Sequence, residues 1–387
     1  MLVRHYVQSQ EYRRRLVPFF RRVAWRTLFS TNRRAFSAMV RVTLGRALRW
    51  LPMTVKARRL GVRLPMTLQV ADEVACRASC ANCCFTAFSG QRERLDFATL
   101  DRLFDEALAL NVTIVYLMGA DPFYRDDADG FLDLVARHRG QLFFLFTEGK
   151  RLTDAHLERI RRAGNILPTI NIDGLRDATD RRKGAGSFEV VDALLAKLHA
   201  AKMPFLVTTM VSRENFDEVT GAAFARWLDD RGAWMIAYLP YTPADAAAER
   251  GLVMDEPMRL RLFERSLGLN REVRRLVVLD LLGIEQHLTA CPAAAYSVTV
   301  YHDGTVTPCP AATFGDRDGN IHRRSLEDIY VNGRLYRGIR ALRAQAGGSL
   351  ACLFYTDKKF FREYLSANRD SVNVLNPGAT QVLQEGP

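Results

Sequence analysis

Cysteines near residue 80 have the spacing of metal ligands. In the segment Cys76-Arg-Ala-Ser-Cys80-Ala-Asn-Cys83, the thiols are separated by three and then two residues. Thiolates with this spacing in one loop can converge on a cluster of iron and sulfide. Three such ligands hold three of four irons and leave the fourth exchangeable. A zinc site or unrelated buried cysteines would share the bare spacing, so the neighbouring elements have to decide between them.

The whole set of seven cysteines argues against a disulfide framework. Their number is odd, and the first 64 residues do not form an export signal, because arginines interrupt every apolar stretch. No stretch approaches the roughly 18 apolar residues that cross a bilayer. We therefore expect a cytoplasmic protein whose reduced thiols serve metal or redox chemistry.

The elements that must position these thiols follow a repeating strand–helix order. The pattern predicts strands at Met66–Val70, Thr113–Met118, Leu142–Phe146, Ile166–Ile172, Phe205–Val211 and Met235–Leu239, with helices such as Phe97–Ala109, Asp154–Ala163, Glu189–Ala201 and Phe216–Arg231. Such repeats imply a parallel sheet with right-handed crossovers, and about six units suit a partial or complete α/β barrel. In barrels the site forms at the C-terminal strand ends, where Gly119, Thr147, Asp173 and Ser212 fall.

The cysteine segment, directly after the first expected strand, resembles the CxxxCxxC signature of the radical SAM superfamily. In that family the exchangeable iron binds the amino and carboxylate groups of S-adenosylmethionine (SAM). An electron from the cluster cleaves SAM to a 5′-deoxyadenosyl radical, which abstracts hydrogen from a substrate. The resemblance covers about residues 66–285. It implies an α/β fold with a partial (β/α)6 barrel over residues 65–285, Cys76, Cys80 and Cys83 as ligands of a 4Fe–4S cluster, and a reductant such as flavodoxin or ferredoxin.

Further strand ends resemble the SAM-binding motifs of the family. Gly119-Ala-Asp-Pro122 resembles GGEP, which contacts the SAM amino group, but here Ala120 replaces the second Gly and Asp121 replaces Glu. Aspartate still supplies a carboxylate acceptor, one methylene shorter. Asn171-Ile-Asp-Gly174 resembles S-x-D-G, and Ser212 follows another strand of this kind. The resemblance implies SAM-binding roles for Gly119, Ala120, Asp121, Asn171, Asp173 and Ser212.

Residues 286–372 resemble the SPASM and twitch domains of radical SAM enzymes. Cys291, Gly304 and Cys309 match their CxnGx4C opening, and Gly319-Asn-Ile321 with Ser325-Leu-Glu-Asp-Ile329 matches the continuation. The resemblance implies a small α+β domain, whose hairpin holds one auxiliary 4Fe–4S cluster on Cys291, Cys309 and Cys352. A hairpin that has lost its cluster is the alternative. Residues 373–387 are expected to be a loose tail.

Two other features admit a plain structural interpretation. Cys84, next to Cys83, is expected to be a small buried thiol, although it is also a candidate fourth ligand of the auxiliary cluster, as are another side chain, water or substrate. Arg181-Arg182-Lys183 follows the fourth strand and could bind a phosphate or carboxylate, but a charge run is usually a solvated face.

The net charge of +12 belongs to residues 1–64, which we call the arm. The arm carries +15, with Glu11 as its single acid, and the remaining chain carries −3. Its arginines alternate with large apolar residues, and a helical stripe is predicted at Phe36, Met39, Val40, Leu44, Ala47, Leu48 and Leu51. Three interpretations compete: an interfacial helix pair on an anionic membrane, an RNA-binding segment, or packing across the barrel. Nucleic acid is the weakest partner, because no folded binding module is evident.

These features rank the substrate classes. A membrane lipid or isoprenoid comes first, with the enzyme peripheral at the inner face of the membrane, followed by a peptide or protein and then RNA. Many SPASM and twitch relatives that modify peptides carry a small winged-helix recognition domain, and the arm has no strand pattern of that kind. An alternative from a different functional class is an electron-transfer protein that holds clusters and does not cleave SAM.

Overall fold

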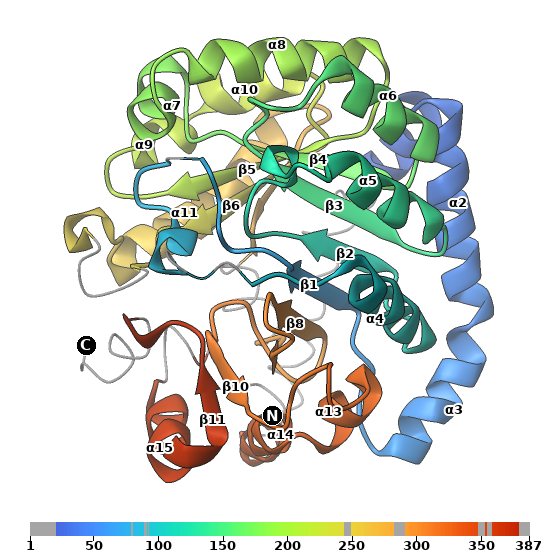
Figure 1. Cartoon of the computed structure of the whole chain (residues 1–387). Helices are drawn as coiled ribbons and strands as arrows, with labels where there is room; N and C mark the ends of the chain where they lie inside the picture. The colour runs from blue at the N-terminus through green and yellow to red at the C-terminus, as the bar shows by residue number, and fades with distance from the viewer. Residues whose placement is uncertain are drawn as a thin grey trace, which may run out of the picture.

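A nine-stranded sheet forms the centre of the molecule, with the order β7-β6-β5-β4-β3-β2-β1-β8-β9 (Figure 1). The computed structural model describes residues 21–78, 80–88, 91, 93–243, 249–281, 291–346, 353 and 358–378. All pairs from β1 to β7 are parallel, as the sequence predicted. These strands are β1 (Thr67–Ala71), β2 (Ile114–Leu117), β3 (Leu142–Thr147), β4 (Ile166–Asn171), β5 (Leu206–Val211), β6 (Met235–Pro240) and β7 (Val277–Asp280).

Helices follow the strands in the order expected for a partial barrel. They are α4 (Phe97–Ala109), α5 (Ala128–Arg137), α6 (Asp154–Ala163), α7 (Arg176–Lys183), α8 (Ser187–Ala200), α9 (Phe216–Val219), α10 (Ala222–Asp230) and α11 (Glu256–Glu272). One predicted helix, residues 216–231, is divided at Gly221, whose amide turns back to the Glu218 carbonyl at 3.1 Å. The short 3-10 helices η1 (Cys84–Phe88), η2 (Pro122–Tyr124) and η3 (Arg250–Leu252) lie in the strand-to-helix connections.

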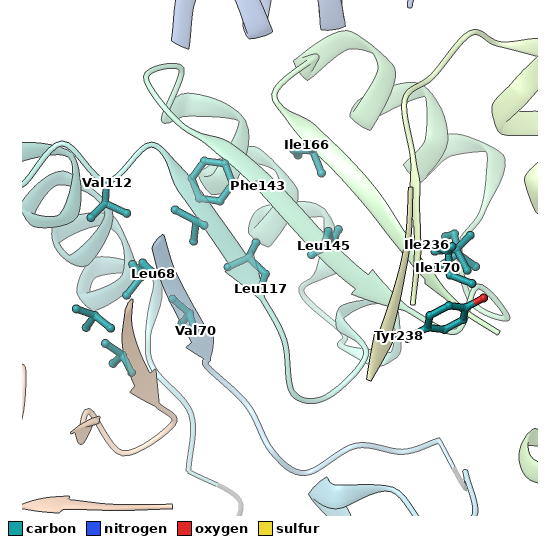
Figure 2. Packing of buried hydrophobic residues seen from close by; sticks show 14 of the residues in the cluster. Leu68, Val70, Val112, Leu117, Phe143, Leu145, Ile166, Ile170, Ile236 and Tyr238 are labelled. Atoms are coloured by element: carbon teal, nitrogen blue, oxygen red, sulfur yellow. The ribbon is translucent and has the colours of Figure 1, made fainter. Parts of the chain in front are cut away.

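β1, β2 and β3 largely alternate buried and half-buried residues, whereas β4 and β5 are buried almost throughout, and most of the buried side chains belong to one continuous core. Figure 2 shows Leu68 and Val70 of β1, Leu117 of β2, and Phe143 and Leu145 of β3 in this core. Parallel strands are covered on both faces, which explains their long apolar runs in the sequence. Tyr238 belongs to the same core: it is fully buried and its hydroxyl donates to the Val219 carbonyl at 2.6 Å.

The predicted C-terminal hairpin forms, but its first strand joins the barrel sheet. β8 (Ser297–Tyr301) pairs antiparallel with β9 (Val306–Thr307) and parallel with β1, in a register that runs from Thr67↔Ser297 to Ala71↔Tyr301. Val298 and Val300 are buried in the same core as the barrel strands, which favours this extension. The other elements of this part are β10 (Phe314–Asp316), β11 (Val372–Val374), α13 (Leu326–Asn332), α14 (Arg334–Gln345), α15 (Lys359–Ala367) and η4 (Arg369–Ser371).

The described part of the arm packs against the N-terminal ends of the barrel strands. It contains a helical stretch at residues 21–29, then α2 (Arg33–Leu48) and α3 (Trp50–Leu60), drawn in blue along one side of Figure 1. Met39 contacts a small buried cluster at the starts of β4, β5 and β6. Arg46 donates to the Thr113 hydroxyl at 3.2 Å and Arg49 to Asn111 at 3.0 Å, both just before β2. The arm therefore covers the edge opposite the C-terminal strand ends.

The predicted apolar stripe of the arm faces mostly outward. Of its seven residues only Met39 is buried, and the buried face consists of Ala35, Ala38, Met39 and Val42. Small alanines let the helix approach the strand ends closely, which the larger side chains of the stripe would prevent. The exposed large apolar residues of the arm are Trp25, Leu28, Phe29, Val40, Leu44, Leu48, Trp50, Leu51 and Val55. Within the described ranges, no helix has both the length and the apolar character to cross a membrane.

Candidate active site

The three predicted cluster ligands lie together in the loop after β1, which we call the cysteine loop (residues 76–83). Cys76, Cys80 and Cys83 are all half-buried, and Ser79 between them is outside the described residues. The charge of a Cys83 thiolate acts on both Cys76 and Cys80, so the three sulfurs are within electrostatic range of one another. In the part of the chain that the structure describes, no three His, Cys, Asp or Glu side chains are grouped as a metal ion would need.

Backbone contacts fix the cysteine loop over the ends of β2 and β4. The Ala81 amide donates to the Arg182 carbonyl at 2.8 Å, and the Arg182 Nε donates back to the Ala81 carbonyl at 3.1 Å. Asn82 takes the left-handed conformation, with φ of 55°, that turns the chain toward Cys83. The Cys76 sulfur accepts a hydrogen bond from the Asp121 amide at 3.5 Å. The loop is therefore positioned by α7 and by the residues after β2, and not only by its own turns.

Burial and nearby cations act in opposite directions on the thiols of the cysteine loop. Burial raises the pKa of Cys80 to about 11, and the charges of Lys183 and Arg182 oppose that rise. A hydrogen bond from Cys84 lowers the pKa of Cys83 to about 6. Iron binds thiolates, and nearby cations favour the thiolate form. The half-buried thiols with two cations beside them are thus suited to an anionic iron–sulfur cluster.

The end of β2 requires a glycine at its first motif position. Gly119 has φ of +114°, and a Cβ there would stand 2.4 Å from the Glu73 carbonyl oxygen. The following Ala120 amide donates to the same carbonyl at 2.9 Å, which joins this strand end to the start of the cysteine loop. The first Gly of the predicted SAM-binding motif is therefore demanded by a close backbone approach.

Asp121 acts as a connector between two strand ends. One carboxylate oxygen accepts from the Phe123 amide at 3.0 Å, and the other accepts from the Thr147 hydroxyl at 2.7 Å and the Glu148 amide at 2.8 Å. Burial raises the pKa of Asp121, and these three hydrogen bonds partly oppose that rise. The carboxylate that the sequence assigns to SAM is thus already engaged in joining the end of β2 to the end of β3.

The predicted residues at the ends of β4 and β5 form one hydrogen-bonded group. Asp173 is buried, accepts from the Met210 amide at 2.9 Å and pairs with Arg182. Asn171 accepts from the same guanidinium at 3.2 Å. The Ser212 amide donates to Asn215 at 2.8 Å, and Asn215 in turn donates to the Asp173 carbonyl at 2.9 Å. The structure thus brings Asn171, Asp173 and Ser212 to adjoining positions beside the cysteine loop.

Sequence reasoning named the charged run Arg181-Arg182-Lys183 without assigning it a place in the site, and it missed Glu148. The run Arg181-Arg182-Lys183 is not one solvated face: Arg181 is exposed, whereas Lys183 is buried and donates to the Asn171 carbonyl at 2.5 Å. Successive helix residues point in different directions, so a run of three in α7 could not share one environment. Glu148, immediately after β3, is also buried against the cysteine loop. Its position directly after a predicted strand is the feature of the sequence that could have identified it as a site residue.

Two of the C-terminal cysteines, Cys291 and Cys309, flank the β8–β9 hairpin. Cys291 is buried and Cys309 half-buried, while Cys352 lies outside the described residues. Gly304, with φ of +85°, closes the hairpin turn, and the Cys309 sulfur accepts from the Ala311 amide at 3.4 Å. Cys291 precedes β8 and Cys309 follows β9, so both lie at the open end of the hairpin. Thiols here could be ligands of an auxiliary cluster, which needs further donors from the rest of the chain.

The residues that follow the hairpin, 319–321 and 325–329, have structural roles. The Ile321 amide donates to the Gly304 carbonyl at 2.9 Å, and Asn320 donates to the Asp303 carbonyl at 2.8 Å, so this motif braces the hairpin turn. Ser325 caps α13 by accepting from the Asp328 amide at 3.2 Å. Leu326 and Ile329 are buried in the core.

The two cysteine regions also touch through aromatic residues. Phe88 of η1, the helix that begins at Cys84, stacks on Tyr301 at the end of β8 with ring centroids 5.9 Å apart. Burial is the largest cause of the raised pKa of Tyr301, and the charges of Cys309 and Cys84 raise it further. Cys84 is exposed, which differs from the expected buried thiol.

Comparisons with known proteins agree with this arrangement. The chain matches the radical SAM superfamily over residues 74–224 and an iron–sulfur cluster-binding domain, SPASM, over residues 291–353. The PqqA peptide cyclase of Ruegeria pomeroyi is 29% identical over 42% of this chain and 44% of its own length. The AdoMet-dependent heme synthase of Methanosarcina barkeri is 33% identical over 30% of this chain and 34% of its own length. The chain thus matches less than half the length of either relative.

Longer similarities extend over most of the molecule. The mycofactocin maturase MftC of Mycobacterium ulcerans is 24% identical over 87% of this chain and 95% of its own length. Among solved structures, Streptococcus suis SuiB bound to the precursor peptide SuiA has a TM-score of 0.60 at 14% identity, covering 75% of this chain and 70% of SuiB. The chain therefore belongs to the radical SAM superfamily and has a C-terminal SPASM domain, and these two domains imply 4Fe–4S clusters and SAM as cofactors.

Proposed function

We propose that the chain modifies a peptide or protein by radical SAM chemistry. The observation that carries the proposal is the similarity to the maturase MftC over nearly the full length of both chains. The relative named a PqqA peptide cyclase and the fold shared with peptide-bound SuiB support the same substrate class. This reverses the order in which the sequence ranked the substrates, where the arm placed lipid first.

The position of the arm also favours a peptide over a lipid. The arm packs on the N-terminal ends of the strands, whereas the cysteine loop, Asp121 and Asp173 lie at their C-terminal ends. A bilayer that contacts the exposed face of the arm would therefore meet the edge of the barrel opposite the site. What the arm binds can therefore differ from the substrate that reacts at the site.

In the proposed reaction the chain's own residues hold and orient the cofactors. Cys76, Cys80 and Cys83 hold the SAM-binding cluster, and Asn171, Asp173 and Ser212 provide polar groups beside it. When bound, the cluster supplies the electron that cleaves SAM to a 5′-deoxyadenosyl radical. Burial of Asp173 and Lys183 keeps this edge dry and strengthens their electrostatic interactions.

Mass spectrometry of candidate substrates tests the proposed substrate class. The reconstituted enzyme, SAM and reductant are incubated anaerobically with short peptides encoded beside its gene, and in parallel with total lipid extract. We expect a SAM-dependent mass change in a peptide, together with faster release of 5′-deoxyadenosine. A mass change confined to the lipid fraction would overturn the proposal and restore the lipid interpretation.

For the arm we propose peripheral binding to an anionic membrane surface. Residues 21–64 contain 12 Lys and Arg and no acid. Next to these charges, Leu48, Trp50 and Leu51 are 82%, 67% and 63% exposed. Large apolar side chains flanked by cations are the combination that inserts at a lipid headgroup boundary. Each cation near an anionic surface adds about 1 kcal/mol.

Vesicle flotation measures this binding directly. We expect the enzyme to float with vesicles that contain phosphatidylglycerol, and the triple variant Leu48→Ser, Trp50→Ser and Leu51→Ser to bind at least about tenfold more weakly, because each buried apolar side chain contributes about 1.5–3 kcal/mol. Leu260→Ser, at an exposed position of α11, is the control variant and should bind to vesicles like the parent. Equal flotation of the triple variant, or equal binding to phosphatidylcholine alone, contradicts the proposal.

A further inference from the structure

The site contains two acidic side chains where its sequence motif provides one. Asp121, the motif acid, has three protein donors on its two oxygens. Its reach is also one methylene shorter than that of the glutamate in the family motif. A carboxylate that joins two strand ends in this way is poorly placed to receive a ligand as well.

Glu148 presents the second carboxylate to the cysteine loop. It follows β3 directly, and its side chain is only 5% exposed. One oxygen accepts from the Tyr124 hydroxyl, and the other stands 3.6 Å from the Cys80 sulfur. The Glu148 amide is held by Asp121, so the shortened motif acid positions the backbone from which this longer acid projects.

The cations near Glu148 are anchored to other groups. Lys150 lies 3.4 Å from its carboxylate, but the Lys150 amine donates to the Lys183 carbonyl at 2.6 Å. Lys183 donates to the Asn171 carbonyl at 2.5 Å. The oxygen that faces Cys80 has a thiol as its neighbour, and a cysteine that binds iron as thiolate no longer has a proton to donate. In the loaded enzyme this buried oxygen keeps Lys150 Nζ at 3.4 Å and gains a lone pair that can accept from a ligand.

We propose that Glu148 accepts a hydrogen bond from the amino group of bound SAM, in place of the shortened Asp121. An amino group bound to iron still carries N–H donors, and the Glu148 carboxylate stands 3.6 Å from the sulfur of Cys80, a ligand of the SAM-binding cluster. A buried charge-assisted hydrogen bond is among the stronger polar contacts a protein makes. Asp121 is then a positioning residue, which sets the end of β3 through the Thr147 hydroxyl and the Glu148 amide.

Equilibrium dialysis with two ligands tests this assignment. Binding of SAM is compared with binding of an analogue that lacks the α-amino group, on reconstituted enzyme normalised to iron content. The parent should prefer SAM, and Glu148→Gln, which keeps the shape and the acceptor for Tyr124, should lose about tenfold to hundredfold of that preference. Asp121→Asn is the comparison, and it should retain the preference of the parent even if it binds both ligands more weakly.

The outcome does not depend on turnover. A ratio of two affinities is unaffected by the fraction of enzyme that carries a cluster. An unchanged preference in Glu148→Gln, or a preference lost in Asp121→Asn alone, overturns the proposal. If Glu148→Gln takes up no cluster, Glu148→Asp decides: it keeps the charge at shorter reach, so a reduced preference supports the assignment and an unchanged one overturns it.

Discussion

Replacement of Cys80 by alanine is expected to abolish SAM cleavage and to leave the C-terminal iron in place. Cys80 is one of three half-buried thiols in the cysteine loop, and two ligands do not hold a cluster with one exchangeable iron. We expect formation of 5′-deoxyadenosine to fall by at least about a thousandfold, because no electron reaches SAM. Anaerobic chromatography of the reaction and iron analysis of the reconstituted protein measure both effects.

Neighbouring thiols provide the controls. Cys84→Ala removes the exposed thiol next to Cys83 and should keep both the SAM-binding cluster and the cleavage of SAM. Cys291→Ala and Cys309→Ala should lower the iron content by about four per chain without affecting the cysteine loop. Unchanged iron in these two variants would remove the auxiliary cluster from Cys291 and Cys309. SAM cleavage by Cys80→Ala at the parent rate would remove Cys80 from the ligand set.

The barrel was predictable because its strands are buried on both faces. Apolar runs such as Leu142–Phe146 and Phe205–Val211 differ clearly from the amphipathic helices between them. Two features of the sheet did not follow from local patterns. β7 extends the sheet beyond the six predicted units, and the pairing of β8 with β1 joins residues more than two hundred positions apart. Pairings of this range are decided by the folded core and leave little trace in a short window of sequence.

The site was predictable where a motif reflects a backbone requirement, and less so where geometry assigns a role. Gly119 and the three cysteines are found from spacing, since their types are fixed by a close approach and by metal binding. Glu148 and Lys183 have no motif, and only the fold shows that both are buried beside the cysteine loop. The arm illustrates the same limit: its helical period was evident, but small alanines at Ala35 and Ala38 selected the buried face.

Substitution of Gly119 by alanine is expected to destabilise the fold and to displace the SAM site together. A Cβ at this position would lie 2.4 Å from the Glu73 carbonyl oxygen, and the backbone is at φ of +114°. Neither atom can move freely, because the same carbonyl accepts from the Ala120 amide. We expect the free energy of unfolding to fall by about 3 kcal/mol or more, since strain and a backbone clash act together. Anaerobic urea denaturation measures this loss.

Gly61→Ala separates the clash from the strain. Gly61 also has a positive φ, +66°, but a Cβ there would meet nothing within 4 Å. This control should lose about 1 kcal/mol, the cost of placing alanine in a left-handed conformation. Displacement of the β2 end would also move the Asp121 amide away from Cys76, so Gly119→Ala should bind SAM more weakly even where its cluster is intact. If both variants lose the same stability and Gly119→Ala binds SAM normally, the close approach of Glu73 does not position the site.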